Sequence, residues 1–237
     1  MRQEIPLIEK ACKLTDETFE YVLTKIKKGV TEKELSLEIQ RFIRANGAGL
    51  SFRPLVSFGK NTAEVHHKST DKKLKKNNIV MLDFGAKIEG FCSDMTRTVF
   101  IGRASRKQKK IYSAVLKAQQ KAVKFLMRVQ PLADTNSLVK GLNPSAKEVD
   151  KVARDYIISQ GYPTIPHGLG HGVGKKVHEP PKISPKSRAI LKPGMVFSIE
   201  PGIYIKNFGG VRIEDLVVLE KTGPRILTKS PKRIIEL

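Results

Sequence analysis

Residues 79–100 read IVMLDFGAKIEGFCSDMTRTVF, two apolar runs joined by a short polar turn, and this stretch decides the fold. Short apolar runs rich in β-branched residues predict strands. We therefore expect a hairpin with a tight turn at Ile88 and Glu89, which places Asp83 directly opposite Asp94, their Cβ atoms ~5 Å apart. A turn shifted by one residue makes the two acids diagonal neighbours. Carboxylates this close repel each other unless a cation or a proton lies between them.

A second pair of acids repeats this pattern nearer the C-terminus. A hairpin centred on Asn207 places Glu200, in FSIEPG, on the strand facing Glu214, in VRIED. Arg212 precedes Glu214 by two residues and therefore shares its face, where a guanidinium group can hold a carboxylate. The recurrence indicates one site built from two acidic hairpins.

Imidazole groups are concentrated near these acids. His167, His171 and His178 all lie in HGLGHGVGKKVHE, and His66 and His67 are adjacent upstream. For His67 we expect a structural hydrogen-bonding role. Four carboxylates and one imidazole form an oxygen-rich site that suits manganese, cobalt, iron or zinc. Two such ions ~3.5–4 Å apart share a bridging water and polarise a carbonyl, which favours amide hydrolysis.

Four amphipathic helices are expected around the strands. The first spans residues 6–28. The other three begin with capping boxes, in which an N-cap hydroxyl and a side chain three residues later bond reciprocally to backbone N–H groups: Thr31 with Glu34, Ser105 with Gln108, and Ser145 with Glu148. Gly47 and Gly161 suit helix C-termini.

The order of the expected elements favours an α+β fold with two similar halves, because helices followed by a hairpin occur twice. Strands are predicted at residues 79–84, 97–101, 196–200 and 211–219, and a loop or insertion at 131–144. With 237 residues and 40% hydrophobic content, the chain suits a single domain spanning residues 1–237.

Composition excludes several classes of protein. Two cysteines are too few for a disulfide scaffold, and neither a signal peptide nor an apolar run of ~20 residues is present, so we expect a cytoplasmic protein without membrane contact. The net charge is +21, with basic runs at 72–76, 106–110 and 181–188. A solvated lysine surface is the main interpretation. Nucleic-acid or ribosome contact through phosphates is the alternative.

Four strings carry a family resemblance: LDFGAKIEGFCSDMTRTVF, HGLGHGVGKKVHE, MVFSIEPGIY and GGVRIED. They resemble the metallopeptidases of the pita-bread fold, and among these the Xaa-Pro aminopeptidases and prolidases. The likeness extends from about residue 6 to the C-terminus. It implies an α+β pita-bread fold with pseudo-twofold halves and an antiparallel sheet flanked by helices. Because family members usually carry a separate N-terminal domain, we expect this chain to be the catalytic domain alone.

The resemblance implies a ligand set for two divalent ions, with manganese expected first and cobalt, zinc or iron as alternatives: Asp83, Asp94, His171, Glu200 and Glu214. Asp94 and Glu214 would bridge the ions. Asp83 would bind one ion, and His171 with Glu200 the other. Glu200 would also accept a proton from the nucleophilic water.

Four further residues are implied to act outside the ligand set. His178 would donate a hydrogen bond to the substrate carbonyl oxygen as the tetrahedral intermediate forms. His167 and His66 would line the pocket around the first two substrate residues. Arg212 is also implied to be an active-site residue.

The function implied is a dinuclear metal-dependent exopeptidase that hydrolyses the N-terminal Xaa-Pro bond of a peptide with proline at its second position. A homodimer is compatible with the resemblance. A methionine aminopeptidase of the same fold is the first alternative, and His167 and Arg212 argue against it. The second is a non-catalytic pita-bread module that binds nucleic acid, ribosomes or acidic partners, and the complete ligand set argues against that.

Overall fold

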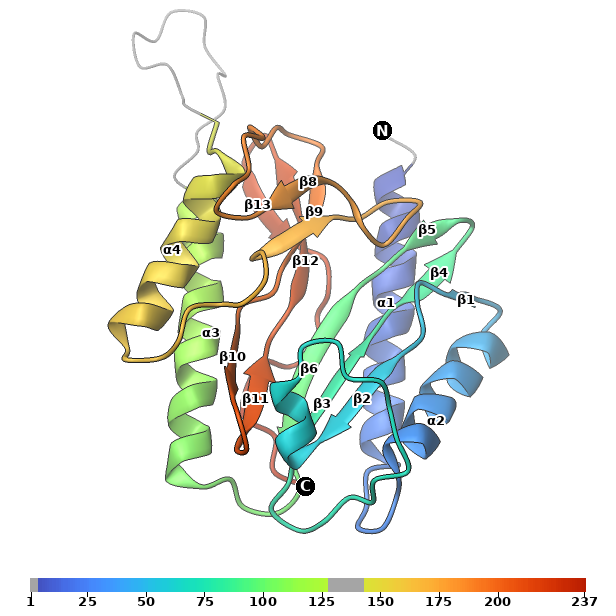
Figure 1. Cartoon of the computed structure of the whole chain (residues 1–237). Coiled ribbons are helices and arrows are strands. Elements are labelled where there is room, and N and C mark those ends of the chain that lie inside the picture. The colour runs from blue at the N-terminus through green and yellow to red at the C-terminus, as the bar shows by residue number, and fades with distance from the viewer. Residues whose placement is uncertain (1–3, 128–142) are drawn as a thin grey trace, which may run out of the picture.

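The computed structural model describes residues 4–127 and 143–237 (Figure 1). Its helices are α1 Glu4–Leu23, α2 Glu32–Ala45, α3 Arg106–Leu126, α4 Ala146–Ser159 and the short 3-10 helix η1 Gly59–Ala63. Its strands are β1 Gly49–Leu50, β2 Leu55–Phe58, β3 Ile79–Phe84, β4 Ala86–Ile88, β5 Phe91–Cys92, β6 Met95–Phe100, β7 Gly170–Gly172, β8 Glu179–Ile183, β9 Val196–Ile199, β10 Gly202–Ile205, β11 Gly209–Arg212, β12 Asp215–Glu220 and β13 Gly223–Ile226.

All three predicted capping boxes are confirmed. The hydroxyl at each N-cap accepts a hydrogen bond from the backbone N–H three residues later, and that residue's side chain bonds back to the N-cap N–H, at the starts of α2, α3 and α4. The first helix is shorter than predicted and ends at Leu23, not Lys28. Ile26 nevertheless stays buried, at 7% exposure, within the turns that follow. The apolar spacing that predicted a longer helix therefore continues past the end of α1, because Ile26 is buried without being helical.

The first hairpin differs from the prediction by one residue. Asp83 pairs with Thr96, and the turn lies at Glu89 and Gly90, which have φ of 49° and 86°. Asp83 and Asp94 are therefore diagonal neighbours, and the expectation that they face each other directly is wrong. A two-residue turn with positive φ at both positions favours glycine second. The predicted turn would have forced the β-branched Ile88 into that conformation.

The second hairpin has the predicted register. Ile205 pairs with Gly209 around Asn207, and Ile199 pairs with Asp215 farther along. The single strand expected at 211–219 is instead divided into β11 and β12, with Glu214 lying between them. This interruption turns the strand at the level of the acidic cluster.

The expected α+β architecture with two similar halves is confirmed. In each half a pair of helices packs on antiparallel strands: α1 and α2 beside β2–β3–β6, and α3 and α4 beside β13–β12–β9–β7–β8 (Figure 1). One apolar core lies mainly in the first half and includes Phe19 and Phe58, and another lies mainly in the second and includes Tyr112 and Phe197. A third joins the halves: Ile8, Cys12, Phe91 and Cys92 pack with Val173, Val196, Leu216 and Val218.

The halves join where β6 meets the end of β11. The Glu214 N–H donates to the Thr96 carbonyl at 3.1 Å, and the Thr98 hydroxyl bonds to both backbone groups of Arg212. Residues from both acidic hairpins are therefore brought to one seam.

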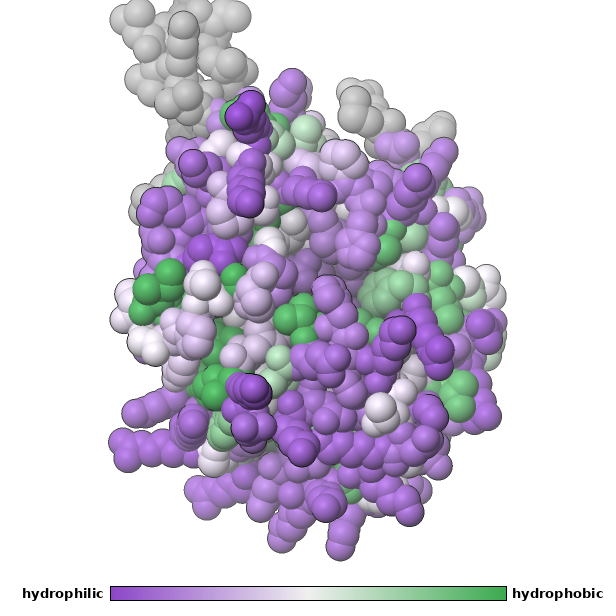
Figure 2. Space-filling model, viewed as in Figure 1, coloured by the Kyte–Doolittle hydropathy of each residue, from purple (hydrophilic) through white to green (hydrophobic). Residues whose placement is uncertain are grey.

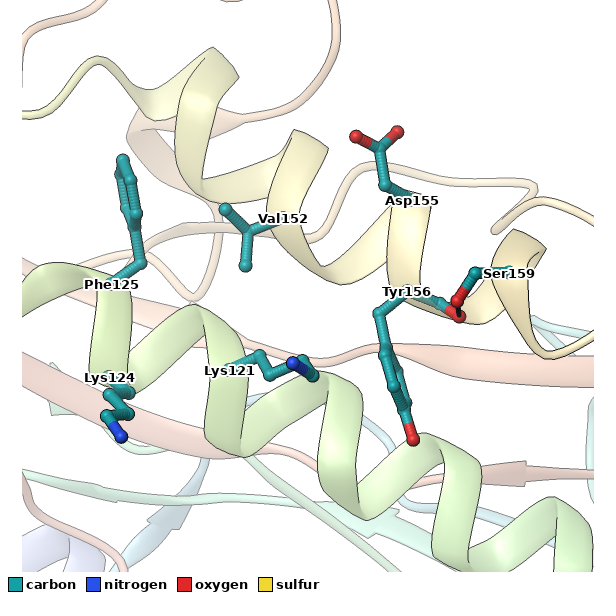
Figure 3. Close-up of a pocket in the computed structure, with 7 residues that line it drawn as sticks. All are labelled: Lys121, Lys124, Phe125, Val152, Asp155, Tyr156 and Ser159. Carbon is teal, nitrogen blue, oxygen red and sulfur yellow. Dashed lines mark hydrogen bonds between the residues drawn. The ribbon is translucent and has the colours of Figure 1, made fainter.

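A groove between α3 and α4 lies away from this seam (Figure 3). It has a volume of about 450 Å³, and Lys121 lies over the Tyr156 ring at 5.1 Å. Its acid, Asp155, pairs with Lys151. The groove therefore lacks an acid–imidazole cluster among the described residues.

None of the helices in the described part of the chain is both long and apolar enough to cross a membrane. The loop predicted at 131–144 lies, apart from its last two residues, outside the described part.

Candidate metal centre

Three predicted ligands form a compact group at the seam. Asp94 follows β5, His171 lies on β7 and Glu214 lies between β11 and β12, and one potential ligand atom from each lies within 4.8 Å of the others. His171 Nε2 is 3.2 Å from a carboxylate oxygen of Glu200. Asp83 and Glu200 line the cleft above the group. The structure therefore brings all five predicted ligands to one place.

Glu214 has the environment expected of a carboxylate that binds a cation. Its Oε2 accepts a 2.7 Å hydrogen bond from the Thr96 hydroxyl. Its Oε1 is buried and has no hydrogen-bond partner among the residues that the structure describes. Because an unpaired buried oxygen costs free energy, a metal ion beside it would remove the penalty. The donor set thus fits a metal.

The acids also perturb one another's ionisation. Burial, and next the charge of Glu214, raises the pKa of Asp94 well above its usual value. Burial, and next the charge of Glu200, raises the pKa of Glu214 to about 8. Because nearby carboxylates disfavour each other's ionised form, the cluster favours a proton or a cation between them.

His171 supplies positive charge to the cluster in this structure. Burial would lower its pKa, but the hydrogen bond and charge of Glu200 outweigh burial and raise the pKa to about 9. Burial alone would raise the pKa of Glu200, but its hydrogen bond to His171 and the charge of His171 outweigh burial and lower that pKa. Nδ1 of His171 donates to the Gly172 carbonyl at 3.2 Å, so Nε2 points at the acids. This arrangement is typical of a metal-binding imidazole.

Arg212 contacts one of the predicted ligands directly. It is 3% exposed, and its Nη2 donates to Asp83 Oδ2 at 2.6 Å. Its Nε donates to the Thr96 hydroxyl and its Nη1 to the Tyr204 hydroxyl, each at 3.0 Å. The predicted contact with a carboxylate is therefore present, and it is made with Asp83, on the other hairpin.

Tyr204 connects Arg212 with His167. The His167 Nδ1 lies 2.7 Å from the Gly168 carbonyl, which can only accept, so the imidazole proton is on Nδ1. Nε2 is then the acceptor of the 2.9 Å bond from the Tyr204 hydroxyl. Burial raises the pKa of Tyr204 to about 12, which keeps this donor protonated. Sequence reasoning missed Tyr204, although it ends the quoted MVFSIEPGIY.

The other predicted active-site histidines border a cleft of about 670 Å³. His178 lies edge-on to the His171 ring, with ring centroids 4.3 Å apart. Burial, and next the charge of His171, lowers its pKa. His66 also lines this cleft, and the apolar side chains of its wall include Phe52 and Leu55.

His67 has the structural contacts that were expected. Its Nε2 lies 2.8 Å from Glu32 Oε2 and its Nδ1 3.0 Å from Glu64 Oε2, and it is not among the residues that line the cleft. Glu32 is fully buried and was not singled out in the sequence, where it reads as an ordinary acid in the first turn of a helix.

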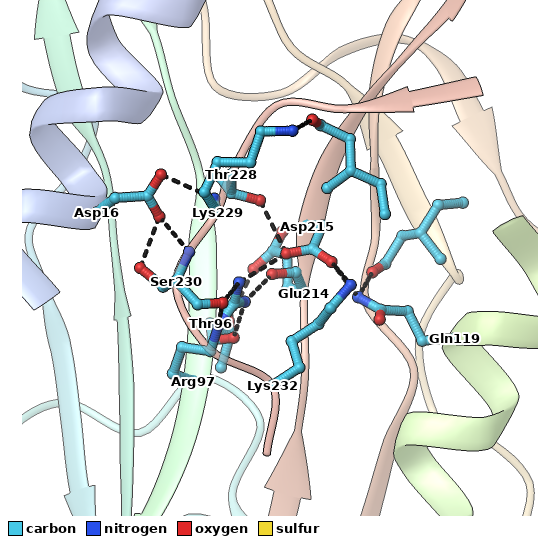
Figure 4. A network of polar contacts seen from close by, with 12 residues as sticks. Asp16, Thr96, Arg97, Gln119, Glu214, Asp215, Thr228, Lys229, Ser230 and Lys232 are labelled. Carbon is cyan, nitrogen blue, oxygen red and sulfur yellow. Dashed lines mark hydrogen bonds and ion pairs between the residues drawn. The ribbon is translucent and has the colours of Figure 1, made fainter.

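A second buried network lies behind the acidic cluster (Figure 4). Arg97 and Asp215 pair at 2.7 Å and are 1% and 0% exposed. The Arg97 guanidinium also donates to the carbonyls of Thr96 and Glu214. It thereby ties together the two backbone segments that face each other across the seam. A charged residue within a largely apolar strand, as Arg97 is in MTRTVF, could have predicted this buried ion pair from the sequence.

Comparisons with known proteins agree with this geometry. Residues 6–221 match the model of metallopeptidase family M24. The chain is 40% identical over 99% of its length to an uncharacterized peptidase of Bacillus subtilis, and 38% identical over 98% to a Xaa-Pro dipeptidase of Pyrococcus horikoshii. It covers 63% of each of these relatives.

A solved structure extends the likeness to the fold. The X-Pro aminopeptidase from Thermotoga maritima matches all of this chain with a TM-score of 0.91 and 36% identity, over 64% of its own length. The expected pita-bread fold is therefore confirmed.

Proposed function

This chain belongs to metallopeptidase family M24, and from that membership we propose that it is a metal-dependent exopeptidase acting on Xaa-Pro peptides. The observation that carries the proposal is the acid–imidazole group of Asp94, His171 and Glu214, with one buried Glu214 oxygen left unpaired among the described residues. The printed name of the Pyrococcus horikoshii relative, a Xaa-Pro dipeptidase, supports the substrate class. We also propose that the described residues act as one catalytic domain.

The metal set proposed is two divalent ions, with manganese first and cobalt, zinc or iron as alternatives. The residues that would hold them are Asp83, Asp94, His171, Glu200 and Glu214. Divalent ions bound there would polarise the substrate carbonyl and lower the pKa of a water molecule. The oxygen-rich donor set supports hard or borderline metals over metals that prefer thiolates.

The remaining chemistry falls to side chains at the cleft. Glu200 lines the cleft beside His171 and would accept a proton from the attacking water. His178, whose pKa is lowered, is a neutral donor for the carbonyl oxygen as negative charge develops on it. Arg212 holds Asp83 in place.

His167 and His66 are proposed to contact the substrate around its first two residues. Because the Tyr204 hydroxyl occupies Nε2 of His167 and the Gly168 carbonyl occupies Nδ1, we assign His167 to shaping the pocket, not to proton transfer.

A metal-replacement assay tests the proposal. The protein is stripped with a chelator, manganese is restored, and the peptides Leu-Pro, Leu-Pro-Ala, Leu-Ala-Ala and Met-Ala-Ala are followed by mass spectrometry. We expect metal-dependent release of leucine from Leu-Pro, from Leu-Pro-Ala or from both, and little cleavage of the other two. Preferential release of methionine from Met-Ala-Ala would identify a methionine aminopeptidase instead. Absence of metal-dependent cleavage of all four peptides would contradict the enzyme assignment and favour a binding module.

A further inference from the structure

Three basic segments that are far apart in the sequence lie together at one end of the molecule. Residues 25–33 and 70–78 are joined by backbone hydrogen bonds, including Gly29 N–H to the Leu74 carbonyl at 3.0 Å. Residues 70–78 and 101–110 are joined by Asn77 N–H to the Ile101 carbonyl at 2.7 Å. We call these three segments the basic end. It is the lower end of the molecule in Figure 1.

Positive charge is concentrated there. The three segments contain thirteen Lys or Arg and two acids, so they carry +11 of the chain's net charge of +21. Both acids are already engaged, because Glu32 is buried among hydrogen-bond donors and Asp71 pairs with Lys33 at 2.7 Å. At the margin, Glu236 pairs with Lys109. Most of these cations therefore lack a counter-charge within the described residues.

The start of α3 adds to this excess. The first turns of α2 and α4 contain acids, as expected at a positive helix end, whereas α3 has none there and begins with Arg106 and Lys107. Cations at this position oppose the helix dipole. An external anion at the basic end would relieve that repulsion.

The surface chemistry favours a nucleic acid over a membrane. Apart from Leu237 beside Gly102 and the half-buried Val30 and Ile101, apolar side chains of the basic end are covered: Ile26 is 7% and Leu74 1% exposed. Figure 2 accordingly shows the lower end covered almost wholly by hydrophilic residues. A membrane-binding surface usually adds apolar side chains to its lysines. The three segments also contain no aromatic residue to stack on bases, so a nucleic acid bound there would be held through its phosphates.

We propose that the basic end binds the phosphate backbone of a nucleic acid without reading its bases. Lysine contacts to phosphates release counterions and suffice for such binding. The basic end is separate from the cleft, because β3 starts beside it at Ile79 and reaches the cleft at Asp83, about 13 Å farther at ~3.3 Å per residue. Binding at this end leaves the cleft open.

Fluorescence anisotropy with a labelled RNA duplex of about 20 base pairs tests the proposal. We expect log Kobs to fall with log[KCl] with a slope of about −3.6 or steeper, the value for about four neutralised phosphates. A fourfold variant with Lys27, Lys28, Lys75 and Lys76 changed to Gln should bind at least about tenfold more weakly and with a shallower slope.

The matched control changes four exposed lysines elsewhere, Lys147, Lys186, Lys192 and Lys221, to Gln, so that both variants lose the same net charge. We expect it to retain RNA affinity, and both variants to retain the melting temperature and peptide cleavage of the original protein. Equal weakening in both variants would show that net charge alone drives binding and would overturn the proposal. Binding to phosphatidylserine vesicles in place of RNA would also overturn it.

Discussion

Glu214 has one carboxylate oxygen bonded to Thr96 and the other buried without a partner among the described residues, while burial and neighbouring acids raise its pKa. Asp94 has the same crowding. A cation bound between such carboxylates would stabilise them, so substitution of a single acid tests metal binding most directly.

We expect Glu214→Gln to remove metal binding and peptidase activity together. The amide has nearly the same size, so the variant should stay folded, but it cannot supply an anionic oxygen. Manganese affinity, measured by calorimetry, should fall by more than the ~10- to 100-fold typical of an outer-shell change. Glu17→Gln, at an exposed acid paired with Lys13, is the control. Retained turnover in Glu214→Gln would contradict the proposed bridging role.

His178 should separate catalysis from metal binding. It touches the His171 ring but is not in the compact acid–imidazole group. If it donates to the carbonyl oxygen in the transition state, His178→Ala should lower kcat by about 10²–10³-fold. Manganese affinity should change little. A variant with unchanged kcat would show that His178 has no such role.

At the scale of elements, one buried acid at the start of α2 fastens the loop that carries His66. Glu32 accepts hydrogen bonds from the backbone N–H groups of Phe58 and Thr70 and from the side chains of Asn61 and Thr70, and it pairs with His67. The loop follows β2, and its far part is also held by backbone hydrogen bonds to residues 29–33 and by the Val56 N–H bond to the Ser69 hydroxyl. Helix α2 thereby sets the position of one wall of the cleft.

This anchor predicts a pH dependence of stability. Burial alone would raise the pKa of Glu32, but hydrogen bonds from Thr70 and His67 hold it below its ordinary value of 4.5. Because the folded state binds this proton less readily than the unfolded state, the stabilisation is present above pH ~4.5 and is lost as pH falls through the folded pKa.

Glu32→Gln should therefore lower the free energy of unfolding at pH 7 by about 1–3 kcal/mol. Its stability should also fall less steeply between about pH 5 and pH 3 than that of the original protein. Urea unfolding across this pH range measures both effects, with Glu17→Gln as the control. Parallel pH profiles for Glu32→Gln and the original protein would refute the account.

At the scale of the whole molecule, the candidate centre belongs to neither half alone. Asp83 and Asp94 come from the first half, and His171, Glu200 and Glu214 from the second. One apolar cluster, which includes Cys12 and Leu216, already joins the halves, and ligands shared across the seam would couple their stabilities further. Arg97 adds to this coupling through its bonds to Asp215 and the Glu214 carbonyl.

Removal of metal should accordingly destabilise the entire chain. At a free metal concentration about 100 times Kd, binding adds about 2.7 kcal/mol to the free energy of unfolding. Calorimetry should therefore show a melting temperature several degrees lower after chelation, restored by manganese but not by sodium. An unchanged melting temperature would argue against metal binding at the seam.

Arg97→Met should weaken the seam without touching the cleft. Methionine has neither a charge to pair with Asp215 nor a donor for the two carbonyls, and losing one partner of a buried ion pair typically costs about 3–5 kcal/mol. Because Lys232 also pairs with Asp215, we expect the lower end of that range. Unfolding in urea measures the loss, and a change below about 1 kcal/mol would show that the network is dispensable.

Features that depend on neighbours a few residues apart could be predicted from the amino-acid sequence. The capping boxes of α2, α3 and α4 join residues three positions apart. The register of the second hairpin likewise follows from its turn around Asn207. The wrong position predicted for the first turn was also a local matter, because Gly90, which favours positive φ, indicated the correct turn. The family resemblance supplied the five candidate ligands.

Contacts between distant parts of the chain became visible in the folded protein alone. Tyr204 bonding His167, Arg212 holding Asp83, and Glu32 anchoring the loop beside His66 join residues from about 35 to about 130 positions apart. The basic end arises in the same way, from three separated segments. Such contacts depend on how the two halves pack against each other. The free energy of that packing comes from apolar side chains throughout the cores, so no short stretch of sequence predicts it.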